Sequence, residues 1–182
     1  MENKGLSKLI TQLNNPKTQS YLEFKDLVLS LVFPWYWNST IGDLSLKVDG
    51  YHNLGHYGHV FLERPEQVRN RVPRQTSEHL DKVSDIIAEI LQFNNIELNS
   101  FLRISANCVH PSSDILNSTP HVDHEFDHKN ILLYLTSAGG STVVKDEIFN
   151  PNEDDVIIFG GETHYMQTPK QDRRVILVAT FV

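Results

Sequence analysis

Apolar residues recur at helical spacing in the N-terminal half of the chain and predict three helices. The first is short and ends before Pro16, and its apolar positions are Leu6, Leu9, Ile10 and Leu13. The second carries one stripe formed by Tyr21, Phe24, Leu27, Val28 and Leu31. The third covers residues 77–92, with Ser77 as its N-cap and an apolar face formed by Leu80, Val83, Ile86, Ile87, Ile90 and Leu91. The aromatic segment 33–37 contains Pro34 and therefore cannot be regular helix.

Short apolar runs separated by turn residues predict strands from Phe101 onward. Gly139-Gly140, Pro151-Asn152 and Gly160-Gly161 lie between the runs and provide the backbone angles that tight turns need. Strands this short and this closely spaced are typical of a sandwich or a barrel, and we expect the helix at 77–92 to lie against one of its faces. The predicted strands cover residues 101–109, 130–136, 141–145, 155–159, 163–168 and 174–182.

Neither a repeat nor a linker divides the chain, so we expect a single domain over residues 1–182. In this domain an N-terminal helical part, about 1–95, supports a β-rich core over about 100–182. The chain has 182 residues, of which 40% are hydrophobic and 21% charged, so it can bury a core without stapling by disulfides.

The composition also narrows the compartment and the partners. Cys108 is the single cysteine, so an intramolecular disulfide is excluded and a small buried side chain is predicted. Residues 1–18 lack the apolar core of a signal peptide and no run is long enough to span a membrane, so we expect a cytoplasmic protein without a membrane partner. The net charge is −7 and the pI is about 5.7, and the sequence has no basic run other than Arg69-Asn70-Arg71. This composition disfavours nucleic acid as the main partner.

A dense group of candidate metal ligands precedes the strand predicted over residues 130–136. Residues 121–128 read His-Val-Asp-His-Glu-Phe-Asp-His. Side chains at i and i+2 of an extended segment point the same way, so His121 and Asp123 can reach one ion. Two imidazoles and one carboxylate on one face of an octahedral iron leave three positions open, enough for a chelating 2-oxo acid and O2.

The remaining histidine groups compete weakly with this pair. A second His-x-Asp, at residues 79–81, lies in the first turn of a predicted helix, where i and i+2 do not face each other. His124 and His128 with their acidic neighbours are expected to form a mobile, solvated lid beside the ligands. His56 and His59 would face opposite sides of a strand, so we expect the histidines of residues 52–59 to be hydrogen-bonded structural groups.

The third candidate ligand and an anion-binding residue come from the end of the chain. His164 follows a predicted strand and the Gly160-Gly161 turn, and ten residues later Arg174 opens the last strand. An arginine buried in a strand needs an anion, and its planar fork suits the distal carboxylate of 2-oxoglutarate. Arg173 is the rival for this role. Arg174 is preferred because Ile176 and Val178 share its face; the alternative is that both arginines belong to a solvated loop end.

Several of these segments carry a family resemblance. They are residues 120–123, 131–135, 139–142, 155–159, 164 and 173–177, with 33–36 and 58–61 in the N-terminal half. Together they resemble the prolyl-4-hydroxylase-like 2-oxoglutarate/Fe(II) oxygenases, in particular the small single-domain members from phage and marine microbial genomes. The resemblance covers most of the chain and is most specific over 101–182. It implies a mainly β fold with packed helices, the double-stranded β-helix, or jelly-roll, of a cupin-like barrel.

The resemblance also implies an activity. Carried over residue by residue, it makes His121, Asp123 and His164 the iron ligands and Arg174 the residue that binds 2-oxoglutarate. The cofactors are then Fe(II) and 2-oxoglutarate, with O2 as co-substrate and ascorbate as a further candidate. The reaction it implies hydroxylates an unactivated C–H bond of a peptide, a prolyl residue included, or of a small molecule, and releases succinate and CO2.

One departure from the family pattern concerns a tyrosine. Many relatives place a tyrosine on the strand after His-x-Asp, where it hydrogen-bonds the carboxylate that the arginine binds. In this chain Leu133 is expected at that position, with Tyr134 facing the other way. Lys129 and Asn107 are the candidates to replace it.

Two other functions compete with the oxygenase. A jelly-roll module could bind a metal or a sugar without redox turnover, but it has no need for Arg174 near His164. An oxygenase acting on nucleobases is the third hypothesis, and the acidic balance of the chain disfavours it.

Overall fold

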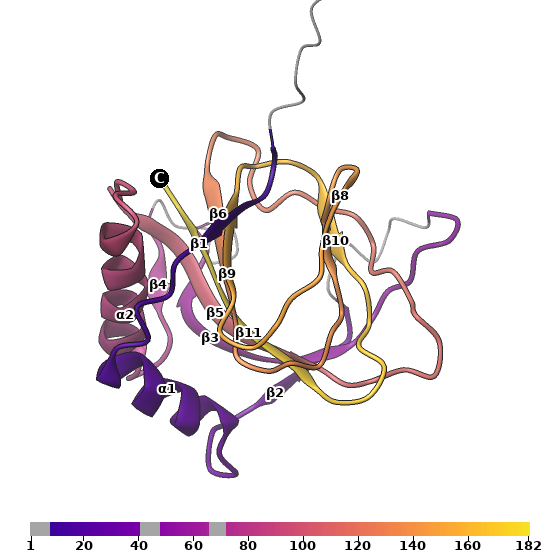
Figure 1. The fold of residues 1–182 in the computed structure, drawn as a ribbon, viewed down its shortest axis with the longest axis horizontal. Helices are drawn as coiled ribbons and strands as arrows, with labels where there is room; N and C mark the ends of the chain where they lie inside the picture. The colour runs from indigo at the N-terminus through magenta and orange to yellow at the C-terminus, as the bar shows by residue number, and fades with distance from the viewer. Residues whose placement is uncertain (1–7, 41–47, 66–71) are drawn as a thin grey trace, which may run out of the picture.

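The computed structural model describes residues 8–40, 48–65 and 72–182, which form two antiparallel sheets facing each other and two helices outside the larger sheet (Figure 1). The larger sheet has the order β1-β9-β6-β11-β5-β3-β2, with β4 paired to β3, and the smaller has the order β10-β7-β8. This arrangement is a double-stranded β-helix, which confirms the predicted fold class. The elements are β1 (Thr11–Leu13), α1 (Gln19–Leu29), β2 (Tyr36–Asn38), β3 (His56–Glu63), β4 (Arg74–Gln75), α2 (Leu80–Phe93), β5 (Phe101–Val109), β6 (Lys129–Tyr134), β7 (Thr142–Val144), β8 (Glu147–Phe149), β9 (Val156–Phe159), β10 (His164–Met166) and β11 (Arg174–Phe181).

Strand β11 separates two hydrophobic cores because both of its faces are covered. All eight of its residues are buried. Val175, Leu177, Ala179 and Phe181 face α1 and α2 and join the larger core. Ile176 and Val178 face the inside of the barrel and pack in the smaller core. Arg174 and Thr180 lie on the same face, at either end of this second pair, so the strand directs polar groups only toward the barrel interior.

The two helices bury one apolar stripe each against the larger sheet. Thr18 caps α1, and its side chain accepts a hydrogen bond from the backbone of Tyr21. The prediction of Ser77 as the N-cap of the other helix is wrong, because α2 begins at Leu80 with His79 as its cap residue. The Ser77 hydroxyl instead contacts the His79 backbone at 3.2 Å and the His59 ring at 2.9 Å.

The helix predicted around residues 6–13 is also wrong. Leu6 lies outside the described residues, and Thr11–Leu13 is a strand, β1, that pairs with β9. A helix this short is marginal in water, whereas the edge of β9 provides backbone partners and a place in the core for Ile10. Three further strands of the first half, β2, β3 and β4, and the short β8 were not predicted.

The strands predicted in the second half are confirmed with small changes at their ends, and β5 has the predicted bounds. Cys108 is buried, as expected. Within the aromatic segment 33–37, Phe33 is buried, whereas Tyr36 and Trp37 are exposed. Within the described part of the chain, neither helix has the length and apolar character that crossing a membrane requires.

Candidate metal centre and cavity

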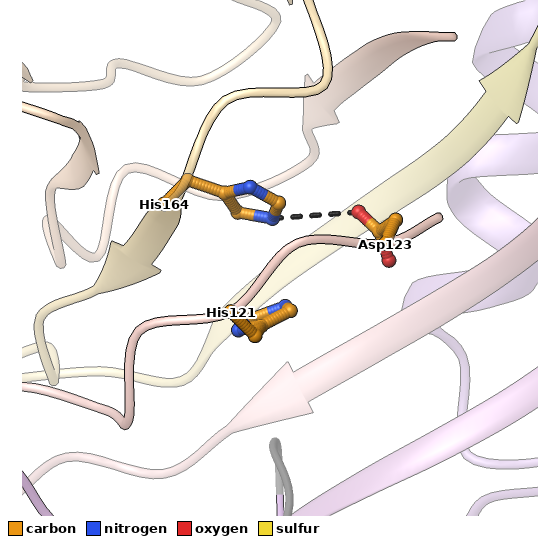
Figure 2. Close-up of side chains that lie close together, drawn as sticks. All are labelled: His121, Asp123 and His164. Atoms are coloured by element: carbon orange, nitrogen blue, oxygen red, sulfur yellow. Dashed lines mark ion pairs between the residues drawn. The ribbon is translucent and has the colours of Figure 1, made fainter. Parts of the chain in front are cut away.

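Two backbone segments bring the candidate ligands together inside one end of the barrel. His121 and His164 form an isolated antiparallel bridge, with each backbone N–H 3.0 Å from the carbonyl oxygen of the other residue. Asp123 follows two residues later on a bend, not on a strand end. The three side chains point toward one another (Figure 2), and their ligand atoms all lie within 4.8 Å of one another. The fold therefore joins residues that are some forty positions apart in sequence.

Backbone carbonyls select the tautomer of both imidazoles. Nδ1 of His121 lies 3.2 Å from the carbonyl oxygen of Thr119, and Nδ1 of His164 lies 3.0 Å from that of Glu162. A neutral ring that donates from Nδ1 keeps a lone pair on Nε2. Burial, and after it the neighbouring His164, lowers the pKa of His121 to about 4, so this ring is neutral near pH 7.

Two arginines hold the carboxylate of Asp123. Its Oδ1 accepts hydrogen bonds from Arg64 at 2.9 Å and from Arg103 at 3.1 Å, and Arg64 also donates to the Asp123 carbonyl oxygen. Oδ2 lies 3.4 Å from Nε2 of His164. Burial opposes ionisation, but the nearby positive charges, of which Arg103 contributes most, together outweigh it and hold the pKa of this carboxyl far below its usual range. Asp123 is thus a carboxylate with one oxygen directed to the two imidazoles.

This donor set suits a divalent transition metal. Neutral imidazole nitrogens and a carboxylate oxygen are the ligands of the facial triad that leaves positions open at iron. The hydrogen bonds that both Nδ1 atoms donate and that Oδ1 accepts are the outer contacts that such ligands usually have. His121, Asp123 and His164 therefore fit a mononuclear iron centre.

A cavity that is partly open to solvent adjoins the three residues. Arg174 lies in its wall and is 3% exposed. The guanidinium donates to the Gly140 carbonyl oxygen and to the Thr142 hydroxyl, both at 2.9 Å, and lies 5.2 Å from the centre of the Tyr134 ring. No carboxylate among the residues that the structure describes pairs with it. Burial lowers the pKa of Arg174, but an arginine stays protonated, so the cavity contains a charge that needs an anion.

Arg173 lies on the other side of the strand. Its guanidinium donates to the carbonyl oxygen of Leu29 at the end of α1. Of the two arginines considered from the sequence, only Arg174 lines the cavity.

The expected orientation of residues 133 and 134 is wrong. Leu133 belongs to the core beneath the helices, whereas Tyr134 lies inside the barrel beside Arg174. The Tyr134 hydroxyl is 2.7 Å from that of Thr142, which also accepts from Arg174. Successive residues of a strand point to opposite faces, so every residue of this strand faces the side opposite to the one expected. Lys129 lies on the helix side of the sheet, over the ring of Phe181, whereas Asn107 lines the cavity.

Three further histidines of the described chain, His59, His124 and His128, are buried. His59 is buried and contacts the Pro34 carbonyl oxygen and the Ser77 hydroxyl, as expected of a structural histidine. His124 and His128 are buried as well, so the expectation of a solvated lid is wrong. His124 contacts the Thr180 hydroxyl at 2.9 Å. The centroids of the His124 and His128 rings lie 4.8 Å apart.

Sequence reasoning missed three polar residues of the site: Arg103 and Asn130 line the cavity, and Arg64 holds Asp123. The expectation that His56 is a hydrogen-bonded structural group is wrong, because His56 also lines the cavity and its buried Nδ1 has no hydrogen-bond partner among the described residues. Arg103 had a usable signal, because it lies on the barrel side of the apolar strand predicted over 101–109 and thus resembles Arg174 in its own strand. Arg64 had none, since its role depends on contacts between β3 and a distant loop.

Comparisons with known proteins support the fold and no closer relation. No family model matches the sequence, and no curated protein matches it. Among solved structures, an oxidoreductase of the 2OG-Fe(II) oxygenase family from Burkholderia pseudomallei superposes with a TM-score of 0.67 and 12% identity, over 95% of this chain and 85% of that one. A prolyl hydroxylase from Trichoplax adhaerens, in complex with a hypoxia inducible factor peptide fragment, has a TM-score of 0.57 and 12% identity, over 96% and 84%. The α-ketoglutarate-dependent epimerase SnoN has 0.57 and 10%, over 96% and 78%. The resemblance to 2-oxoglutarate/Fe(II) oxygenases is therefore confirmed at the level of the fold.

Proposed function

We propose that this protein is a non-haem Fe(II), 2-oxoglutarate-dependent dioxygenase. His121, Asp123 and His164 bind the iron, and Arg174 binds the distal carboxylate of 2-oxoglutarate. The observation that carries the proposal is the presence, in one cavity, of a two-histidine, one-carboxylate group and a buried arginine that no described carboxylate pairs with. A module that only binds a metal or a sugar has no use for that second feature.

Each residue has a defined task in this proposal. The two Nε2 lone pairs and Oδ2 of Asp123 are the ligand atoms, since the other polar atoms of these side chains are held by the protein. Iron with 2-oxoglutarate and O2 supplies the oxidising chemistry for hydroxylation of an unactivated C–H bond, with release of succinate and CO2. The carbonyl oxygen of Gly140 and the hydroxyl of Thr142 orient the Arg174 fork.

The apolar part of the cavity wall keeps water away from the reacting groups. Leu132, Ile176 and Val178 line it between the arginine and the candidate ligands. Charge interactions are stronger where water is excluded, which favours a tight contact between Arg174 and a carboxylate.

The substrate class follows from the same proposal. It is a peptide, with a prolyl residue as one candidate, or a small molecule. The Trichoplax adhaerens neighbour is a prolyl hydroxylase solved with a peptide fragment, which supports testing peptides first. Ascorbate is a further addition to test in turnover assays.

An anaerobic titration with Fe(II) and 2-oxoglutarate tests the cofactor assignment. We expect the visible charge-transfer band of a chelated 2-oxo acid in the wild type, its loss in His164→Ala and a weakened 2-oxoglutarate affinity in Arg174→Met. Arg173→Met is the matched control, because the neighbouring arginine contacts the end of α1 and does not line the cavity. Metal binding without any band would contradict the proposal and favour a binding module.

A further inference from the structure

The cavity holds a second, half-buried cation at the end opposite Arg174. Arg103 lies on β5 directly opposite Thr180 of β11, six residues along that strand from Arg174. At roughly 3.3 Å per residue the two strand positions are about 20 Å apart, much farther than a five-carbon acid extends. The distal carboxylate of a 2-oxoglutarate bound to Arg174 therefore does not also reach Arg103.

The hydrogen-bonding capacity of Arg103 is only partly used. Its guanidinium donates to Oδ1 of Asp123 at 3.1 Å and to the Ser105 hydroxyl at 3.3 Å. A guanidinium has five N–H donors, and its side chain is 21% exposed, on the cavity side. Arg64 already donates to the same oxygen of Asp123 and to the Asp123 carbonyl. Asp123 is thus held without Arg103, and Arg103 retains donors for another acceptor.

The charge of the cavity has the opposite sign to that of the chain. Among the described residues that line it, the charged side chains are Arg103, Arg174 and Asp123, so arginines exceed carboxylates by one even though the chain carries −7. Fe(II) and doubly charged 2-oxoglutarate cancel each other when both are bound. An excess positive charge in a partly desolvated cavity favours an anionic second ligand.

An unused hydrogen-bond acceptor lies beside Arg103. Asn130 of β6 is also opposite Thr180, on the other side of β11, so its Cα lies roughly 10 Å from that of Arg103 at the spacing of neighbouring strands. Asn130 is 0% exposed and lines the cavity. Its amide nitrogen donates to the Gly160 carbonyl oxygen, which leaves Oδ1 without a partner among the described residues. A buried acceptor left in this state is costly unless a ligand donates to it.

We propose that the substrate is a small acid, such as a free amino acid, whose carboxylate binds Arg103 and whose N–H or O–H group donates to Asn130. The inference rests on the proposed oxygenase function and selects, within it, a free acid over an internal residue of a peptide. Arg103 and Asn130 lie on the two strands that flank β11 and line the same cavity, so one small molecule can contact both. An internal prolyl residue offers neither a carboxylate nor an N–H.

A matched panel of ligands tests this assignment on the whole protein with Fe(II) and 2-oxoglutarate bound in the absence of O2. The probes are the free amino acids, their carboxamides, the desamino acids and N-acetylprolinamide as a mimic of an internal prolyl residue. Binding is measured by calorimetry and by the change in the charge-transfer band. We expect at least one amino acid to bind about tenfold or more tighter than its carboxamide, as loss of one charge-assisted hydrogen bond implies.

Arg64→Met is the control for Arg103→Met, because both arginines hold Oδ1 of Asp123 at similar distances but only Arg103 lines the cavity. Arg103→Met should abolish the preference for the acid over the carboxamide, and Arg64→Met should preserve it. Asn130→Ala should remove the preference for the amino acid over the desamino acid.

The contrary outcomes are distinct. If no acid binds more tightly than its carboxamide, if Arg103→Met keeps the preference, or if N-acetylprolinamide binds best, the assignment of a small acid is overturned. If the charge-transfer band itself does not form in the wild type, the proposed oxygenase function fails first.

Discussion

Replacing Arg174 by methionine should weaken the binding of 2-oxoglutarate but leave the stability of the apoprotein nearly unchanged or higher. Methionine keeps much of the length of the side chain and suits a site next to Met166 and the Tyr134 ring, but it removes the charge. An arginine that served only the fold would stabilise the apoprotein. An arginine whose role is to bind an anionic ligand destabilises the apoprotein, because its charge is buried without a counter-ion.

The magnitude follows from the contacts of the guanidinium. Its removal leaves the Gly140 carbonyl oxygen without this donor, at about 1–3 kcal/mol, and loses the contact with the Tyr134 ring, at about 1–2 kcal/mol. The Thr142 hydroxyl keeps Tyr134 as a partner. Relief of the buried charge is worth several kcal/mol in the other direction. We therefore expect the free energy of unfolding of the apoprotein to change by less than about 1 kcal/mol or to rise.

Cofactor binding should respond much more strongly. A charge-assisted contact to a carboxylate is worth about 1.5–3 kcal/mol, so the Kd of 2-oxoglutarate should rise by roughly 10- to 150-fold. Urea unfolding of the apoprotein measures the first quantity, and unfolding of the metal-loaded protein with and without 2-oxoglutarate, in the absence of O2, measures the second. A loss of 3 kcal/mol or more in the apoprotein, or equal stabilisation of wild type and variant by 2-oxoglutarate, would refute the reasoning.

Three further predictions concern the surroundings of the site. In Gly140→Ala the new Cβ would lie 2.8 Å from Cδ of Arg174 at a residue with φ +77°, so 2-oxoglutarate affinity, measured by the charge-transfer band, should fall while metal binding persists. Asp123→Asn should abolish metal binding by calorimetry and, because two arginines lose their counter-charge, lower the free energy of unfolding by about 3 kcal/mol. Burial, followed by the charge of Arg103, lowers the pKa of His56 from 6.5 to about 4, so its stabilising contribution is complete above pH 6.5 and is lost as the pH falls toward 4. In urea unfolding of the apoprotein, His56→Gln should reduce the loss of unfolding free energy between pH 6.5 and 4 by up to about 3 kcal/mol. An unchanged pH profile would contradict the lowered pKa of His56.

Local pattern determined much of the fold. The apolar stripe of α2 and the runs that became β5, β6, β9 and β11 were predicted, because burial against one layer or between two imposes a period on the sequence itself. Strands β1, β2, β4 and β8, of three residues or fewer, were not predicted, and neither was the eight-residue β3, whereas the equally short β7 and β10 lie within longer apolar runs and were predicted. What makes Thr11–Leu13 a strand is the free edge of β9, which is far away in sequence.

The same division holds for the site. His121, Asp123, His164 and Arg174 were all named from the sequence, because each has a type and a spacing that the chemistry of iron and a carboxylate requires. That the first three meet within 4.8 Å is a property of the bridge between two distant segments.

Only the tertiary structure showed which of two neighbouring residues faces the barrel and which groups hydrogen-bond to the candidate ligands. Which of residues 133 and 134 faces the barrel depends on the phase of β6 against β11, and a shift of one residue reverses it. The hydrogen bonds of Arg64 and Arg103 to Asp123, and the unpartnered Oδ1 of Asn130, join strands and loops that no local spacing relates. Sequence thus determined the chemistry that this chain carries, and packing decided which groups surround it, because a side chain's type is local whereas its neighbours are set by the register of distant strands.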